Sequence, residues 1–258
     1  MGALGIVWVI IWSKMFTNYP EDHPKVSKEE LAAIRSTDDT FSGEKTVETE
    51  DSSNERWYHF FKSPTLIFNT IGYFGFQYIN FLVLTWTPKY LQDEYHFEIH
   101  SLWYLGMIPW IGAVFTAYFG GRLSDWLRTK TGNLWVARSG LSIFGMILAA
   151  ICFLIIPTTN SVPMIMFLMM LGVAFLFLPN AVYWAVVIDT APKNAGTYGG
   201  ITHFFVNSAT IIAPTLTGIL VSSYGYKSMF ISAVVSAVIG IVAMIFVRPG
   251  YKKMSKQA

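Results

Sequence analysis

The amino-acid sequence predicts an all-α protein that crosses a membrane several times. Of its 258 residues, 53% are hydrophobic and only 13% are charged, whereas a soluble domain usually carries about 25% charged residues. A helix needs roughly 20 apolar residues to cross the hydrocarbon layer of a bilayer. Five stretches without Asp, Glu, Lys or Arg are long enough for this: 65–88, 99–121, 139–188, 194–226 and 228–247.

The first 16 residues form a separate apolar segment ahead of these stretches. No basic region precedes the run MGALGIVWVIIWS and no cleavage site follows it, so a secretory signal is not indicated. Lys14 closes the run, which is short for a complete span. We interpret residues 1–16 as the end of a transmembrane helix that begins upstream, or else as a marginal anchor.

Residues 64–247 are predicted to form a bundle of six complete spans. The uncharged stretch 139–188 has room for two spans, and PTTNSVP at 157–163 predicts the turn between them. SSYGY at 222–226 predicts the turn before the last span. We therefore place the spans at about 65–87, 101–121, 135–156, 162–188, 198–221 and 228–247.

Residues 17–63 differ from the rest of the chain. They carry most of its 16 acidic residues, together with many Ser, Thr and Asn side chains. This composition predicts an aqueous linker that is partly disordered at about 36–55. A short helix is expected to begin at Ser27, because a serine followed three residues later by Glu30 is a capping pattern.

Basic residues gather at one end of the predicted bundle. The linker, the segment 120–138, Lys193 and the tail 248–258 place their basic side chains there, whereas the opposite end has only Lys89 and Lys227. Because Lys and Arg favour the cytoplasmic side of a membrane, we expect the linker and the C-terminal tail to be cytoplasmic. Six spans between them are consistent with that placement.

Other classes of protein receive little support. The single Cys152 lies in an apolar run, which excludes a disulfide framework and a Cys-based metal cluster. The histidines outside the spans have no acidic partners at metal-ligand spacing, and no nucleophile elbow or phosphate-binding glycine loop is present. We expect no enzymatic activity, no cofactor, no metal and no nucleic-acid partner.

The motif GGRLSDWLRTKTG, at 120–132, stands between the second and third predicted spans. Its glycines permit close approach of helices, and its aspartate can accept hydrogen bonds from arginines or from the positive end of a neighbouring helix. Such contacts hold one end of a bundle closed and break when it opens. We therefore predict a gating loop formed by Gly121, Arg122, Asp125 and Arg128. Simple anchoring by positive charge is the alternative, but it does not account for the aspartate or the paired glycines.

This motif resembles the cytoplasmic signature loop of the major facilitator superfamily, which joins the second and third helices of each six-helix half. Three further stretches resemble its anion:cation symporter family. PEDHPKVSKEEL (20–31) is similar to the central linker, LTWTPKYL (84–91) to the end of helix seven, and YWAVVIDTAPKNAGTYGGITHFFVNSATIIAPTLTG (183–218) to helices ten and eleven. The resemblance implies the C-terminal half of a twelve-helix transporter: the end of helix six, the central linker and helices seven to twelve.

The same resemblance implies a function. Members of this family carry out secondary active transport of organic anions, such as hexonates, hexuronates or aldarates, by alternating access. A proton is the expected coupling ion, with Na⁺ as the alternative. The uncharged stretches of these spans hold no Arg or Lys for a carboxylate and no Asp or Glu for a proton, so we hypothesise that a missing N-terminal half supplies both. A half-transporter that needs a partner and a truncated, non-transporting membrane protein stay open as alternatives.

Polar side chains that share a helix face inside the spans are candidates for binding the substrate. Trp184 and His203 lie at a similar depth on consecutive spans, and an ionisable side chain inside a membrane is functional by default hypothesis. The structural alternatives are an interfacial aromatic, a histidine satisfied by a backbone carbonyl, and hydrogen bonds between helices. The candidates are Tyr73, Gln77, Asn80, Asn180, Tyr183, Trp184, His203 and Asn207.

Overall fold

The computed structural model describes residues 2–17, 23, 25–32, 57–98 and 105–250. The chain divides into two compact units, Met1–Asn54 and Glu55–Ala258, and each is described by itself. Three predictions fall wholly or partly outside the described residues: the disordered stretch at 36–55, the start of the span at 101–121, and most of the tail.

The first unit contains an apolar helix, α1 (Gly2–Met15). The ring of Trp12 stacks on that of Phe16, with centroids 4.9 Å apart. A short helical segment at 28–32 follows the predicted cap, because the amide of Glu30 donates to Ser27 Oγ at 3.1 Å. The capping pattern therefore identified this helix start correctly.

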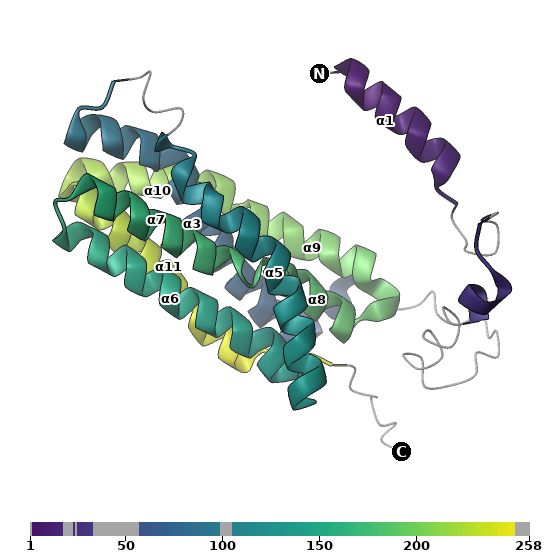
Figure 1. The fold of residues 1–258 in the computed structure, drawn as a ribbon. Helices are drawn as coiled ribbons and strands as arrows, with labels where there is room; N and C mark the ends of the chain where they lie inside the picture. Colours follow the sequence, from purple (N-terminus) through teal and green to yellow (C-terminus); the bar gives the residue numbers. More distant parts are fainter. Residues whose placement is uncertain (1, 18–22, 24, 33–56, 99–104, 251–258) are drawn as a thin grey trace. The chain divides into compact units, whose positions relative to one another are not determined.

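The second unit is a bundle whose long helices lie side by side (Figure 1). The helices follow one another without a strand in the described part of the chain. In chain order they are η2 (Trp57–Lys62), α3 (Pro64–Tyr95), α5 (Ile108–Thr131), η3 (Val136–Gly140), α6 (Leu141–Ile155), η4 (Ile156–Thr158), α7 (Val162–Phe177), α8 (Asn180–Thr190), η5 (Pro192–Asn194), α9 (Ala195–Asn207), α10 (Ala209–Tyr224) and α11 (Tyr226–Phe246).

Five helical stretches among the described residues are long and apolar enough to cross a membrane. They are Pro64–Tyr95, Val136–Thr158, Val162–Thr190, Pro192–Tyr224 and Tyr226–Phe246. The span predicted at 101–121 is not among them. Its helix, α5, begins only at Ile108 and continues to Thr131, so its last turns carry the charged residues of the 120–132 motif.

The core of this unit lies between α3, α6, α7 and α11. Leu82, Phe153 and Met169 are fully buried there, so their apolar surface is removed from lipid and water alike. Small residues bring the helix backbones close together, since Ser236 Oγ on α11 donates to the carbonyl oxygen of Gly75 on α3 at 3.3 Å. Large side chains and close backbone contacts together fix the relative positions of the helices.

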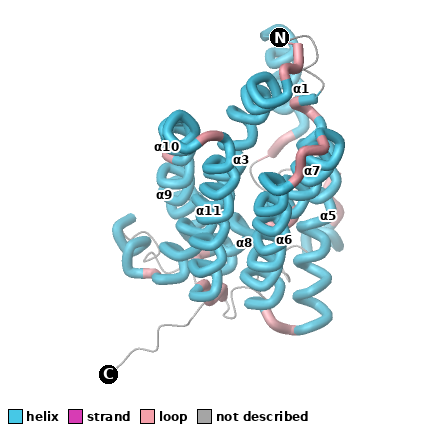
Figure 2. Tube along the Cα trace, turned by 90° about the vertical axis from the view of Figure 1, so that its left-hand side faces the viewer, coloured by secondary structure: helices cyan, strands magenta, loops and turns pink. Residues whose placement is uncertain are grey.

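Helices α9 and α10 lie at one side of the bundle and α5 at the opposite side (Figure 2). The stretch Pro192–Tyr224, which contains α9 and α10, is the least buried of the five: 22% of its most apolar part is buried, against 44–56% in the other four. Its exposed apolar side chains include Phe204, Ile211 and Ile219. This side of the bundle therefore has a broad apolar surface with no partner among the described residues of this unit.

Candidate functional site

Four of the predicted substrate-binding residues come together from three helices. The rings of Tyr73 (α3) and Tyr183 (α8) stack with centroids 4.7 Å apart and planes 5° apart. The imidazole of His203 (α9) lies 5.5 Å from the Tyr73 ring, edge to face, and 5.4 Å from the indole of Trp184 (α8). We call Tyr73, Tyr183, Trp184 and His203 the aromatic cluster. Offset stacked and edge-to-face pairs of this kind add to the burial of aromatic surface.

Local features hold the aromatic cluster in place. The side-chain amide of Asn69 on α3 donates to the carbonyl oxygen of Tyr183 at 3.0 Å, which ties α3 to α8. Gly199 on α9 faces the indole of Trp184, and a Cβ at this position would collide with the ring. A residue without a side chain is therefore what lets Trp184 lie against α9.

The members of the aromatic cluster differ in exposure. Tyr183 is fully buried, whereas 39% of Trp184 is exposed. Tyr73 and His203 are half-buried. Tyr183 therefore lies behind the Tyr73 ring, and the surface that a ligand can contact is formed by Tyr73, Trp184 and His203.

The other four predicted residues are more scattered. Gln77 follows Tyr73 by one turn of α3, and Asn80 has a buried side-chain oxygen with no hydrogen-bond partner. Asn180 is the first residue of α8, and Asn207 is an exposed residue at the end of α9. In the described part of the chain, no side-chain hydrogen bond joins any of these four to the aromatic cluster.

The 120–132 motif is helical as far as Thr131 rather than a loop, which corrects the expected secondary structure, while the gating role of its residues stays a prediction. Helix α5 continues through Gly121, Arg122, Asp125 and Arg128 and ends at Thr131. Its C-cap is Gly132, with φ 63°, a left-handed conformation that favours glycine. The charged side chains therefore project from a rigid helix.

The two glycines of the motif have different surroundings. A Cβ on Gly120 would overlap the carbonyl group of Leu178, so α5 and the end of α7 touch backbone to backbone. A Cβ on Gly121 would come no closer than 3.9 Å to another residue, Ala181. Close approach of helices thus depends on Gly120.

Asp125 bonds an arginine from outside the motif. Nη1 of Arg138, in the π-helical turn η3, lies 3.3 Å from Asp125 Oδ1 and donates to Ser124 Oγ at 2.6 Å. Nε of the same arginine donates to Asp189 Oδ2, at the end of α8, at 2.8 Å. Ser124 Oγ in turn donates to the carbonyl oxygen of Ala137 at 2.9 Å. We call Ser124, Asp125, Arg138 and Asp189 the ionic cluster.

The ionic cluster is mostly removed from solvent. The side chains of Arg138 and Asp189 are 8% and 11% exposed, whereas that of Asp125 is 72% exposed. A buried charge needs a partner because its desolvation is costly. Arg138 and Asp189 therefore form the essential pair, and Asp125 adds to it from the surface.

The sequence could have revealed this pair, but the sequence analysis counts Arg138 only among the basic residues of the segment 120–138 and does not consider Asp189. Arg138 directly precedes the uncharged stretch 139–188, and Asp189 directly follows it. A stretch that forms two spans returns to the side of the membrane where it began, so its two ends lie at the same end of the bundle. Opposite charges at those two ends were therefore a usable signal for an ion pair.

Two of the basic residues of the motif lie on aromatic rings. The guanidinium of Arg122 is 4.7 Å from the centre of the Tyr118 ring, and Lys130 Nζ is 4.6 Å from that of Trp126. These cation–π contacts keep both charges at the surface of α5. Within the described residues, no group of three His, Cys, Asp or Glu side chains is arranged to hold a metal ion.

These features define a class: an all-α membrane protein with several spans, an uncharged polar cluster between three of its helices, and a buried ion pair at one end. The profile of the Major Facilitator Superfamily matches residues 1–214 and again 137–258. The chain belongs to the major facilitator superfamily, and the predicted fold class is confirmed.

Comparison with curated relatives shows which kinds of transporter in this superfamily the chain is similar to. The chain is 32% identical to the hexuronate transporter of Bacillus subtilis over 95% of its own length and 56% of the relative's. It is 31% identical to the probable galactarate/D-glucarate transporter GarP of Escherichia coli, over 100% of the chain and 59% of the relative. A probable sulfoacetate transporter of Cupriavidus necator, SauU, is 28% identical over 96% of the chain and 56% of the relative. The chain thus spans little more than half the length of these relatives.

Proposed function

We propose that this chain is one six-helix half of a secondary active transporter for an organic anion, such as a hexuronate, hexonate or aldarate. One observation carries the proposal: Tyr73, Trp184 and His203 meet from three helices, in a chain that aligns over nearly its full length with transporters of such acids. The domain organisation follows from it. Residues 1–16 would end a preceding span, 17–63 form the linker, 64–247 the bundle and 248–258 the tail.

The chemistry of the aromatic cluster suits a polyhydroxylated ligand. The imidazole of His203 and the hydroxyl of Tyr73 can donate to and accept from sugar hydroxyl groups. The half-exposed indole of Trp184 offers a flat apolar face for the carbon skeleton. Gln77, one turn along α3, extends the polar face. Tyr183 acts from behind by fixing the Tyr73 ring.

A carboxylate also needs a positive charge, which the aromatic cluster does not contain. The buried arginine of this bundle, Arg138, is already engaged by Asp189. We therefore propose that a second six-helix bundle, for which the greater length of the relatives leaves room, supplies the carboxylate-binding cation and the proton-coupling site. Na⁺ is the alternative coupling ion.

The exposed side of α9 and α10 supports pairing with another bundle. This stretch is the least buried of the five apolar spans, and it carries His203 of the aromatic cluster. A partner bundle would cover its apolar side chains and enclose the ligand between the two halves. A half-transporter with a separately encoded partner is the second candidate function.

The ionic cluster would then hold the cytoplasmic end of the bundle closed. Arg138 joins α5, η3 and α8, three elements that must keep their positions in one state and shift in the other. The excess of Lys and Arg at this end agrees with a cytoplasmic linker and tail.

Uptake measurements test the proposal. The chain, joined to an N-terminal half, is reconstituted in proteoliposomes and offered radiolabelled hexuronate and galactarate, with and without a proton gradient. We expect His203→Ala and Trp184→Ala each to raise KM about fivefold or more, which corresponds to about 1 kcal/mol or more of binding. Phe144→Ala is the control, because Phe144 is 53% exposed and lies on α6, which contributes no residue to the aromatic cluster. An unchanged KM in both cluster variants would rule out this site.

A further inference from the structure

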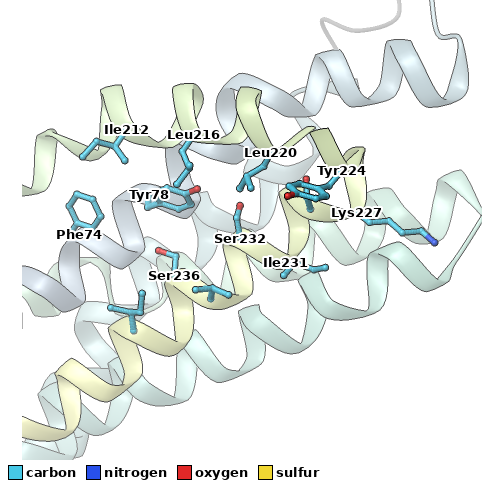
Figure 3. Close-up of a pocket in the computed structure, with 13 residues that line it drawn as sticks. Phe74, Tyr78, Ile212, Leu216, Leu220, Tyr224, Lys227, Ile231, Ser232 and Ser236 are labelled. Carbon is cyan, nitrogen blue, oxygen red and sulfur yellow. The ribbon is translucent and has the colours of Figure 1, made fainter. Parts of the chain in front are cut away.

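An apolar groove runs between α3, α10 and α11 (Figure 3), and no member of the aromatic cluster lines it. Its volume is about 670 Å³, and its walls are mainly aliphatic and aromatic. The serines of α11 add little polarity, since Ser232 Oγ donates to the carbonyl oxygen of Met229 at 2.8 Å. The exception is Tyr78, which is 4% exposed and whose hydroxyl has no hydrogen-bond partner in the described part of the chain.

A smaller, polar pocket adjoins this groove at the end of the bundle opposite the ionic cluster. Its volume is about 330 Å³, and it shares Tyr224 and Lys227 with the groove. Three tyrosines, Tyr90, Tyr95 and Tyr226, also line it, together with Glu94. An elongated apolar compartment that meets a polar one is complementary to an amphiphile rather than to a sugar acid.

The polar pocket contains one cation and one anion that are not paired. Among the described residues, neither Lys227 nor Glu94 has an oppositely charged group within 4 Å, although both are exposed at this end of the bundle. Neighbouring charges are paired instead. Lys89 Nζ is 2.8 Å from Asp93 Oδ1, and the hydroxyl of Tyr226 donates to Asp93 Oδ2 at 2.7 Å. The pocket therefore offers opposite charges to a ligand that carries both.

We propose that this end of the bundle binds phosphatidylethanolamine, with the head group between Lys227 and Glu94 and one acyl chain in the groove. The Lys227 ammonium donates to the phosphodiester, and the ammonium of the head group donates to the Glu94 carboxylate, both as charge-assisted hydrogen bonds. The tyrosine rings favour the same cation.

The head group distinguishes this lipid from the common alternatives. The choline of phosphatidylcholine has no N–H to donate to Glu94. Phosphatidylglycerol has no positive charge, and it would place only a neutral glycerol beside the carboxylate. Selectivity for the ethanolamine head group therefore depends on Glu94, whereas affinity for any phospholipid depends on Lys227.

Native mass spectrometry of the full chain in detergent tests the site. The protein is titrated with phosphatidylethanolamine, phosphatidylcholine and phosphatidylglycerol that carry identical acyl chains. We expect phosphatidylethanolamine adducts to dominate. Lys227→Gln lowers the affinity for all three lipids about fivefold, as expected for one cation near a lipid phosphate, and Glu94→Gln makes phosphatidylethanolamine and phosphatidylcholine bind equally.

Two further variants complete the design. Lys193→Gln removes an exposed lysine at the other end of the bundle and is expected to change nothing. Ser232→Leu narrows the groove and is expected to reduce adducts of every phospholipid. Circular dichroism verifies that helix content is retained in each variant.

Four results would overturn the proposal. They are equal binding of the three lipids by the unmodified chain, a preference for phosphatidylglycerol, unchanged selectivity in Glu94→Gln, and a dimer without lipid adducts. The last would mean that a second copy of the chain covers the groove.

Discussion

The aromatic cluster and the ionic cluster differ in charge and in exposure, although both belong to the same bundle. The aromatic cluster contains no carboxylate, ammonium or guanidinium group, and part of its surface is exposed. The ionic cluster concentrates charge where the side chains of Arg138 and Asp189 are almost completely buried. The proposed ligand site gains from weak, exposed contacts, whereas a region that joins helices gains from contacts that are costly to break.

This comparison predicts the largest effect at Arg138. Arg138→Ala leaves the Asp189 carboxylate buried without a cation, and removing one partner of a buried ion pair costs about 3–5 kcal/mol. The free energy of unfolding, measured by denaturant titration in detergent micelles, should fall by this amount. Arg122→Ala is the control, because Arg122 is exposed on α5 and should change stability by less than about 0.5 kcal/mol.

A double variant distinguishes the loss of the attraction between Arg138 and Asp189 from the cost of leaving the Asp189 carboxylate buried without a cation. Arg138→Met with Asp189→Leu removes both charges and fills the space with apolar side chains, which is often neutral or stabilising relative to a buried pair. We expect it to regain most of the stability lost in Arg138→Ala. A double variant as unstable as the single one would show that packing, and not the buried carboxylate, dominates this end of the bundle.

The next effect concerns the contact between α5 and the end of α7. Gly120→Ala places a Cβ against the backbone carbonyl of Leu178, which cannot rotate away, so the helices must separate. Overpacking of this kind typically costs about 1–3 kcal/mol. Gly121→Ala is a matched control one residue away, where the nearest atom is 3.9 Å distant. It should be neutral or stabilising, because alanine favours a helix over glycine by about 1 kcal/mol. Similar stabilities for the two variants would contradict the close approach at Gly120.

Much of the fold was predictable because each membrane span is determined by the composition of one continuous stretch of sequence. Uncharged stretches gave five spans close to the observed ones, and the alternation of spans placed Trp184 and His203 at one level, where their rings lie 5.4 Å apart. Both inferences need only the rise of a helix and the thickness of the hydrocarbon layer.

The failures have a physical reason as well. We expected each helix to end where charged residues begin. Backbone hydrogen bonding instead continues past the hydrocarbon layer until a residue such as Gly132 ends the helix. The burial of individual side chains could not be predicted either. Tyr183 and Trp184 are neighbours on α8, yet Tyr183 is fully buried and Trp184 is 39% exposed. Their difference depends on which helices pack against each side of α8, and this is not a local property.

A third effect concerns ligand affinity without removing any binding group. Gly199→Ala should displace the Trp184 indole, because the added Cβ overlaps the ring. We expect the dissociation constant for a sugar acid to rise about threefold to tenfold, equivalent to about 0.7–1.4 kcal/mol. Gly200→Ala is the control, since no heavy atom lies within 4 Å of its Cβ position. Equal affinities in the two variants, measured by calorimetric titration of the assembled transporter, would exclude Trp184 from the binding surface.

The smallest effect is expected at Asp125, which is mostly exposed, whereas Arg138 and Asp189 of the same cluster are mostly buried. This carboxylate is 72% exposed and lies 3.3 Å from Arg138, so it resembles a surface ion pair worth about 0.2–1 kcal/mol. Asp125→Asn should therefore lower the free energy of unfolding by less than about 1 kcal/mol, and its contribution should decrease further at high salt. Because Arg138 keeps its bond to Asp189, the helices stay joined, and any change should be confined to faster amide hydrogen exchange at the end of α5. A loss as large as that of Arg138→Ala would mean that Asp125 is an essential partner, and that the closed end of the bundle depends on all three charges acting together.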